Sequence, residues 1–468
     1  MFQPNGSVPT DAGRAGSPRD ILRRAGSVPP KAGFPTFEEL MAGFADLQAR
    51  HPDAVQVRRL GMSRAGRPID MYSIGSGRLS HLVVGGVHPN EPIGSWTALH
   101  LAEQLLCDQD LHDGLDARWN IIPCVDPDGY KLNEGWLANP HDRGHYARHF
   151  FRPSGNEQVE WTFPFHYKKA SFDAMLPETR ALRDGIDGVG PDLYVALHNS
   201  EMGGVYYYLS REEPALYPML HEIPRQLGIP LNEGEPEAGF LKAYAPAIFA
   251  DGTLEDAYDW AEALGIEPHP PGSGGDSSGS YARRNHGSLC LIAELPYWRT
   301  SQVSDTSVVE ETYAAVLART GQQMADLTEV LQTAASGGAE VMDWTGQLAR
   351  NALVFVGMMH GAAQTTLARA AQSEANRPAT AAERFGCEDT VRMFRLRYGG
   401  MMLRALESAP NPCPALQAVT ARMSDQYEQW QVEAAAADQS EPIAIEALVG
   451  VQYGATLAAA SHLAGRLV

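Results

Sequence analysis

Short apolar runs alternate with longer amphipathic segments through the first two thirds of the chain. The runs span residues 81–87, 117–125, 193–197 and 288–295. Between the first two, apolar residues recur at helical spacing over 94–106. Runs that are apolar at nearly every position indicate strands buried on both faces, as in a parallel sheet covered by helices. The pattern therefore predicts an α/β fold with a mostly parallel sheet.

The two ends of the chain differ from this central part. Residues 1–34 are rich in Gly, Pro, Ser and Arg, a composition that cannot bury a core and predicts a flexible tail. Residues 307–331 place apolar side chains on one helical face, and small residues then break the pattern. Residues 338–468 are rich in Ala, Leu and Met, with no convincing strand. We expect a tail (1–34), an α/β domain (35–337) and an all-α C-terminal appendage (338–468).

Some helical segments of the appendage are apolar on several faces, as in 348–363 and 443–464. A helix that is apolar nearly all round must be buried on more than one side. This pattern predicts a homo-oligomer joined through the C-terminal helices. The alternative is a self-contained bundle that rests on the α/β domain.

Charge and composition exclude several classes of function. The 468 residues carry a formal net charge of -20, which repels phosphate backbones and anionic lipid. We expect no nucleic-acid or membrane partner, since no apolar stretch reaches the roughly 20 residues of a membrane span and no signal peptide opens the chain. The five cysteines include no CxxC pair and are typical of reduced thiols. The sequence thus predicts a cytoplasmic protein.

Three of the apolar runs end in side chains that bind or activate a metal. His88 and Glu91 follow the first run, His198 follows the third, and Glu294 is the penultimate residue of the fourth. Ligand sites of open α/β sheets gather at the carboxyl ends of strands, so we expect these groups to converge. Two imidazoles and one carboxylate are the three protein ligands of a hydrolytic zinc site. Glu294 is then the general base that takes a proton from the attacking water.

Several segments resemble the carboxypeptidase A-like zinc metallocarboxypeptidases, in particular their bacterial branches. VGGVHPNEPIG resembles the HxxE zinc motif, and IIPCVDPDGY is similar to the NPDGY segment, with Asp126 in place of Asn. PETRAL, LHNSE and LIAELP follow in the family's order, over roughly residues 36–335. The resemblance implies a three-layer α/β/α sandwich around a mixed twisted sheet, one Zn²⁺ per chain and hydrolysis of a terminal peptide or amide bond.

The sequence departs from this family where substrate is recognised. Members carry an Asn-Arg pair that clamps the terminal carboxylate, and Glu160 and Trp161 stand there instead. Arg148 and Arg152 are candidates for the arginine that polarises the scissile carbonyl, and a surface ion pair is their alternative role. We therefore expect a small or modified peptide or aminoacyl substrate without a free terminal carboxylate. The predicted substrate-binding residues are Glu160, Trp161, Asn199 and Tyr281.

Three functions remain open from the sequence. The first is a zinc-dependent metallopeptidase or amidohydrolase, and the second is an N-acyl amino acid deacylase of the aspartoacylase and succinylglutamate desuccinylase type. The third is a catalytically inactive binding protein on the same fold. A second metal site is a further hypothesis, because His141, His145 and His149 follow one another at helical spacing.

Overall fold

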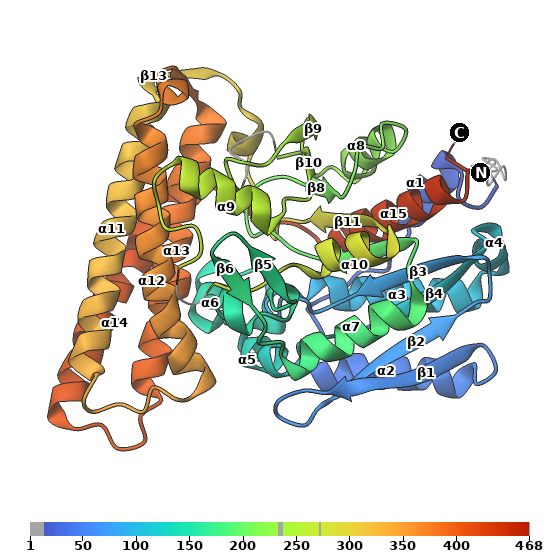
Figure 1. Cartoon of the computed structure of the whole chain (residues 1–468), viewed down its shortest axis with the longest axis horizontal. Coiled ribbons are helices and arrows are strands. Elements are labelled where there is room, and N and C mark those ends of the chain that lie inside the picture. The colour runs from blue at the N-terminus through green and yellow to red at the C-terminus, as the bar shows by residue number, and fades with distance from the viewer. Residues whose placement is uncertain (1–13, 233–236, 271–272, 468) are drawn as a thin grey trace, which may run out of the picture.

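The structure is a computed structural model that describes residues 14–232, 237–270 and 273–467 (Figure 1). Within these residues, nine strands form one large sheet. They are β1 (Val55–Met62), β2 (Pro68–Ile74), β3 (Leu79–Val84), β4 (Ala117–Ile122), β7 (Leu193–Leu197), β8 (Tyr206–Leu209), β9 (Ala243–Ala245), β10 (Ile248–Ala250) and β11 (Leu289–Glu294). Their order is β1-β2-β4-β3-β7-β11-β8-β10-β9. A separate hairpin pairs β5 (Phe165–Tyr167) with β6 (Ala170–Phe172).

The centre of the sheet is parallel. Strands β4, β3, β7 and β11 run in one direction, whereas β1, β2 and β8 join antiparallel to their neighbours. Each apolar run of the sequence forms one of the four central strands. Successive side chains enter two different cores, as Val195 and its neighbour Tyr194 do, because side chains alternate across a strand. The predicted mixed sheet is confirmed, and its four central strands are largely buried on both faces.

Helices cover both faces of the sheet and complete three layers. α2, α3 and α15 pack on one face, and α7 and α10 pack on the other. The helices of this part are α1 (Pro18–Ala25), α2 (Phe37–Arg50), α3 (Ile93–Cys107), α4 (Gln109–Gly114), α5 (Pro127–Leu137), α6 (Arg143–His149), α7 (Pro177–Val189), α8 (Tyr217–Gln226), α9 (Leu254–Ala263), α10 (Ser278–His286) and α15 (Ile445–Leu463).

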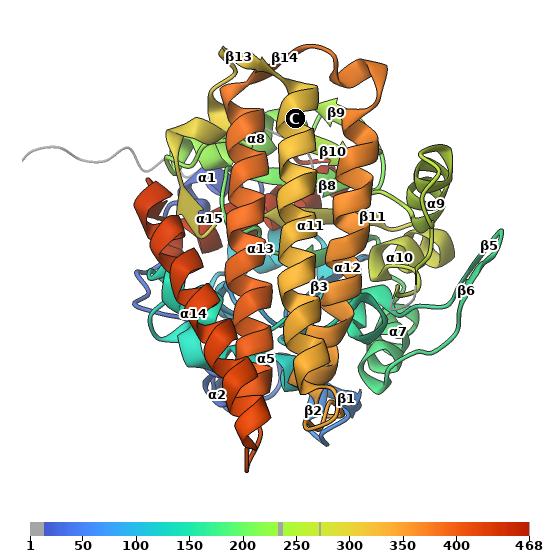
Figure 2. The same cartoon turned by 90° about the vertical axis from the view of Figure 1, so that its left-hand side faces the viewer.

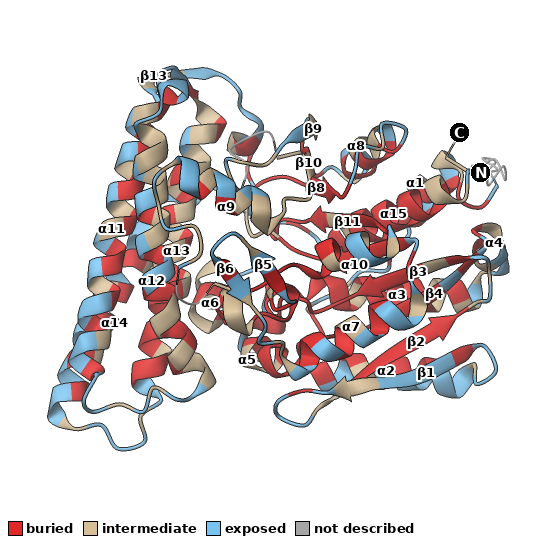
Figure 3. Ribbon diagram, viewed as in Figure 1, coloured by how far each residue is buried: buried red, intermediate tan, exposed pale blue. Residues whose placement is uncertain are grey.

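Four long helices form a bundle beside this sandwich (Figures 1 and 2). They are α11 (Tyr313–Gly338), α12 (Gln347–Ala370), α13 (Ala381–Glu407) and α14 (Pro414–Ala437). The bundle stands on the side toward which β11 points, so it faces the carboxyl ends of the parallel strands. Figure 3 shows its outer surfaces exposed and its inner surfaces buried. Among the helices that are described, none is long and apolar enough to cross a membrane.

The domain boundaries differ from those that the sequence predicts. Residues 14–34 are not a flexible tail, because α1 buries Ile21 and Ala25 and Arg24 pairs with Asp108 at 2.8 Å. Residues 1–13 lie outside the described residues. The helix α11, expected in the α/β domain, belongs to the bundle, and α15, expected in the appendage, belongs to the sandwich.

The C-terminal region also contains two short strands that the sequence does not reveal. β14 (Pro378–Thr380) pairs with β13 (Val308–Thr312), and β15 (Glu441–Pro442) pairs with β12 (Trp298–Arg299). Strands of two or three residues leave no periodic pattern that could be read. Each pair joins the helical region to a segment that follows Glu294. The pair β13–β14 lies at the start of the bundle, and the pair β12–β15 lies where the chain re-enters the sandwich before α15.

Candidate metal centre

The three predicted ligands converge at the carboxyl ends of two neighbouring strands. His88 lies four residues after β3, and His198 directly follows β7, which pairs with β3 in parallel. Glu91 lies two residues before α3. The turn after β3 needs glycine, because a Cβ at Gly85 would lie 2.4 Å from the Pro123 carbonyl oxygen.

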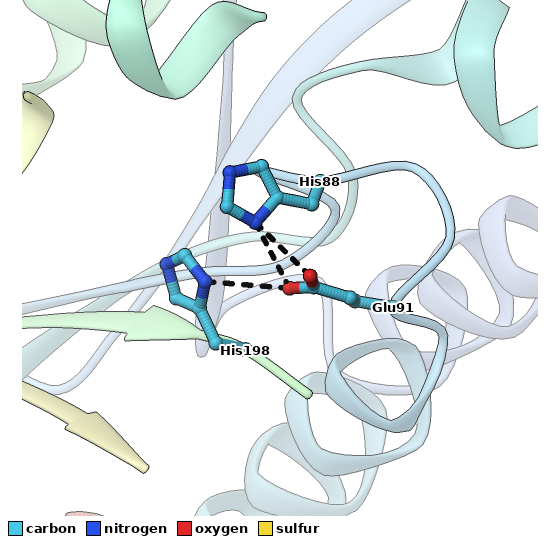
Figure 4. A group of neighbouring side chains, drawn as sticks. All are labelled: His88, Glu91 and His198. Carbon is cyan, nitrogen blue, oxygen red and sulfur yellow. Dashed lines mark hydrogen bonds and ion pairs between the residues drawn. The ribbon is translucent and has the colours of Figure 1, made fainter. Parts of the chain in front are cut away.

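The ligand atoms of His88, Glu91 and His198 all lie within 4.8 Å of one another. Both carboxylate oxygens of Glu91 are 3.1 Å from His88 Nδ1, and Oε2 is 3.3 Å from His198 Nδ1 (Figure 4). All three side chains are buried. In the described parts of the chain this is the one group of three or more His, Cys, Asp or Glu so placed. The hypothesis of a second site at His141, His145 and His149 finds no such cluster.

Burial and neighbouring charges shift the pKa values of the three residues in different directions. Burial, together with the Arg152 guanidinium, lowers the pKa of His88 to about 3. Burial also acts to lower the pKa of His198, but Glu91 and Glu294 outweigh it and raise that pKa to about 9. Burial acts to raise the pKa of Glu91, yet the facing histidines and Arg152 hold it below its usual range. Glu91 is therefore an anion on which two imidazoles converge, a donor set that fits zinc.

Glu294 and Arg152 face this group from two other segments. Glu294 ends β11, the strand beside β7, and its Oε1 is 3.7 Å from His198 Nδ1. The residue is 7% exposed, and burial raises the pKa of its carboxyl group well above the usual range. Arg152 follows α6, with Nη1 3.0 Å from Glu91 Oε1 and Nη2 3.0 Å from His88 Nδ1. The predicted base and one of the two predicted arginines thus lie at the centre.

Asn199 forms hydrogen bonds with the segment that carries Glu91. Its backbone N–H donates to Glu91 Oε2 at 3.2 Å, and its Oδ1 accepts from the backbone N–H of Ile93 at 3.2 Å. The hydroxyl of Tyr297 lies 2.9 Å from the Asn90 carbonyl oxygen and 3.2 Å from Asn199 Oδ1. The polar groups of Asn199 are largely engaged by the protein, although the residue also borders the adjoining cavity.

Gln452 is a positioning residue that the sequence analysis missed. It lies on α15, and its Nε2 donates to the His198 carbonyl oxygen at 2.9 Å. Its Oε1 accepts from Thr97 Oγ1 on α3 at 2.7 Å. A fully buried amide is costly unless it is hydrogen-bonded, so α15 is tied to the third ligand. The available signal was a lone polar residue inside the apolar stretch ALVGVQYGA.

Glu160 is buried, and it lies near enough to His198 for their charges to interact. Its Oε1 accepts from Ser278 Oγ at 2.7 Å, and that hydroxyl in turn accepts from the Tyr194 hydroxyl at 2.6 Å. Burial raises the pKa of Glu160 to about 7, against the lowering effect of His198. The backbone carbonyl of its neighbour Trp161 accepts from the Gly275 N–H at 2.6 Å. A carboxyl group, and no cation, therefore stands at this position.

Two of the predicted site residues lie elsewhere. Arg148 turns toward the bundle, where it pairs with Glu407 at 2.6 Å and lies over the ring of Tyr427. This matches the ion-pair alternative and not a role at the centre. Tyr281 lies on α10, and its hydroxyl donates to Asp187 of α7 at 2.9 Å. The sequence placed both residues near the right segments but could not give the direction of their side chains.

Comparison with known proteins agrees with this geometry. Residues 40–236, less than half of the chain, match the family described as zinc carboxypeptidase. This part of the chain is therefore similar to the zinc carboxypeptidases. All three ligand residues of the domain lie inside the matched range, whereas Glu294 lies outside it. The resemblance inferred from the sequence motifs is confirmed.

Two curated relatives are similar to short parts of the chain. Zinc carboxypeptidase A 1 of Anopheles gambiae is 32% identical over 114 residues, which are 22% of this chain and 26% of that protein. Carboxypeptidase B of Astacus astacus is 24% identical over 99 residues, which are 20% of this chain and 33% of that protein. The matches thus span about a third or less of each relative.

Solved structures with a similar arrangement include several carboxypeptidases. A metallo-carboxypeptidase from Burkholderia cenocepacia has a TM-score of 0.36 at 17% identity, over 56% of this chain and 60% of that one. Carboxypeptidase A from Helicoverpa armigera has a TM-score of 0.38 at 18% identity, over 61% and 71%. An aspartoacylase family protein from Mesorhizobium loti has a TM-score of 0.29 at 15% identity, over 52% and 62%.

Proposed function

We propose that this protein is a zinc-dependent hydrolase that cleaves a peptide or amide bond. The observation that carries the proposal is the convergence of His88, Glu91 and His198 in a buried cluster within the zinc carboxypeptidase domain. One zinc ion held by these residues would supply Lewis acidity for a carbonyl group and for the attacking water.

The residues around the cluster have matching chemical roles. Glu294 stands beside His198, where its carboxylate can take a proton from the attacking water and return it to the leaving nitrogen. Arg152 directs its guanidinium at the same place, where its N–H groups can stabilise negative charge on the carbonyl oxygen.

The substrate proposal rests on Glu160. In the family that the chain resembles, a cation at this position clamps the terminal carboxylate of the peptide. When it is ionised, a buried carboxyl group repels such a carboxylate, and when it is protonated it offers no positive charge to hold it. We therefore propose a small or modified peptide, or an aminoacyl amide, whose terminal carboxylate is absent or masked.

Matched substrates test this function. Zinc per chain is measured on purified protein, and hydrolysis is compared for short peptides that differ only in a C-terminal carboxylate or carboxamide. We expect one zinc per chain and faster cleavage of the amidated peptides. Zinc-bound protein that hydrolyses neither set would instead support a binding protein on this fold. Preferential release of ordinary C-terminal residues would refute the substrate assignment.

A further inference from the structure

A cavity of about 530 Å³ is lined by residues of both the α/β domain and the bundle. Asn90, Arg152 and Asn199 border it on the side of the metal centre, and residues of α11, α12 and α13 border it on the other. Its volume is in the range of roughly 300–1,000 Å³ that is typical of small-molecule sites. We call this cavity the interdomain chamber.

The bundle contributes a mainly apolar wall that also carries hydroxyl groups. Thr320 and Met324 come from α11, Thr366 from α12, and Met393 and Phe394 from α13. The threonine hydroxyls donate to carbonyl oxygens of their own helices, at 2.9 Å for Thr320 and 2.8 Å for Thr366. Their remaining lone pairs can still accept a hydrogen bond. Such a wall suits a group that is apolar and has N–H or O–H donors.

The charges that border the chamber are balanced within the protein. The described lining holds three arginines and three carboxylates. Arg397 pairs with Glu201 at 2.7 Å, and Asp389 pairs with Arg143 from outside the chamber at 2.7 Å. The remaining three charged residues of the lining also have partners, namely Arg152 with Glu91, Arg369 with the Tyr313 hydroxyl, and Glu237 with the hydroxyls of Tyr206 and Tyr208. A charged substrate group would gain little here to offset its loss of water.

We propose that the interdomain chamber binds the acyl side of the substrate, and that this part is an uncharged, largely apolar acyl or short peptidyl group. Glu160 decides which part of the substrate enters the chamber. It stands at the position that binds the C-terminal end of the peptide in the family that the chain resembles, and it is not among the residues that line the chamber. This inference rests on the proposed function and adds a substrate class to it. The bundle is then a wall of the substrate site and limits the length of the group it accepts.

The affinity of substrate-like probes for a variant with slow turnover tests the chamber separately from catalysis. The probes are three glycyl-phenylalanine amides, capped with acetyl, with benzyloxycarbonyl, or with a carboxylated aromatic group of similar size. Affinities are measured by calorimetry on zinc-loaded Glu294→Gln protein. We expect the neutral aromatic cap to bind at least about 10-fold more tightly than the other two, as expected for filling an apolar pocket.

Substitutions that fill the chamber should remove this preference. Thr366→Phe and, one turn earlier on α12, Ala362→Leu both place bulk in the cavity. The control is Gln364→Phe, at an exposed position of the same helix. We expect both filling variants to bind the neutral aromatic cap about 10-fold more weakly and the acetyl cap unchanged, with wild-type melting temperatures.

Each other outcome has a definite meaning. If the caps bind equally, or if the control loses the preference as the filling variants do, the chamber proposal is overturned. If the preference follows the chamber but zinc-loaded wild-type protein cleaves none of the probes, the proposed hydrolase function fails and the binding site stands.

Discussion

At the scale of single residues, the two histidines of the cluster each give one nitrogen to a set of three ligands. Removing either leaves too few protein donors for a site of this kind. We expect His88→Ala and His198→Ala to lose zinc during dialysis, as measured by elemental analysis. The matched control is His221→Ala, because His221 contacts the Pro246 carbonyl and lies outside the cluster. Retention of one zinc per chain by either ligand variant would contradict the assignment.

Glu294 is expected to be needed for turnover and not for metal binding. It lies beside His198 but is not a member of the cluster of ligand atoms. Glu294→Gln keeps the shape of the side chain and removes its basicity. We expect zinc content to stay at the wild-type level and kcat to fall by roughly 10²–10⁴-fold. A variant that loses zinc instead would make Glu294 a ligand.

His81 should make the protein less stable in mild acid. It lies on β3, fully buried against Trp119, and burial lowers its pKa from 6.5 to about 4. Above pH 6.5 the residue is neutral in both states and stability is unaffected. As pH falls toward 4, the unfolded chain gains a proton that the folded chain does not, so the free energy of unfolding falls by about 3 kcal/mol.

The substitution His81→Phe isolates this contribution. It keeps an aromatic ring against Trp119 and cannot be protonated. Denaturant unfolding at pH 7 and pH 4.5 should show a smaller loss of stability for the variant than for wild type. Equal losses would mean that His81 is protonated in the folded protein over this range.

At the scale of elements, the bundle holds the segment that carries Arg152. The backbone N–H of Ser154 donates to Asn351 Oδ1 of α12 at 2.6 Å, and the Phe150 carbonyl oxygen accepts from Arg404 of α13 at 2.9 Å. Arg350 adds an ion pair with Glu157 at 2.8 Å. These contacts flank Arg152 on both sides. The bundle therefore positions Arg152 at the metal centre, although Arg152 lies outside the bundle.

We expect Asn351→Ala to lower kcat roughly 10-fold while zinc content and KM stay nearly unchanged, because a displaced Arg152 loses its transition-state contact. The same substitution in an Arg152→Ala background should have no further effect, since both changes remove one interaction. Gln364→Ala, on the exposed side of α12, is the control. Additive losses in the double variant would show that Asn351 acts by another route.

At the scale of the whole molecule, the homo-oligomer remains a prediction. The structure accounts for α15 without a partner, because this helix is buried between the sheet and α1 in the same chain. Val432 of α14 is 70% exposed, the largest exposure among the large apolar side chains that the structure describes. Light scattering should give a dimer or larger closed assembly for wild type and a monomer for Val432→Glu. A wild-type monomer at all concentrations would favour the self-contained bundle.

The sequence by itself determined the central strands and the ligand set. Burial on both faces requires uninterrupted apolar runs, and a parallel sheet brings the ends of such runs together, so His88, Glu91, His198 and Glu294 could be placed from local pattern alone. The family motifs lie in these same segments and therefore pointed to the same residues.

Only the tertiary structure decided what the remaining helices pack against. An apolar face indicates that a helix is buried but does not identify its partner, so the pattern assigns α15 to an appendage. The composition of residues 1–34 predicts a tail and hides α1, yet α1 and α15 pack together in the sandwich. The same holds for side chains: Arg148 and Arg152 are four residues apart, yet one meets α13 and the other meets Glu91. Gln452 reaches His198 across more than 250 residues, and the chamber exists only where two such distant surfaces meet. Contacts of this range depend on how whole elements pack, and no local pattern encodes them.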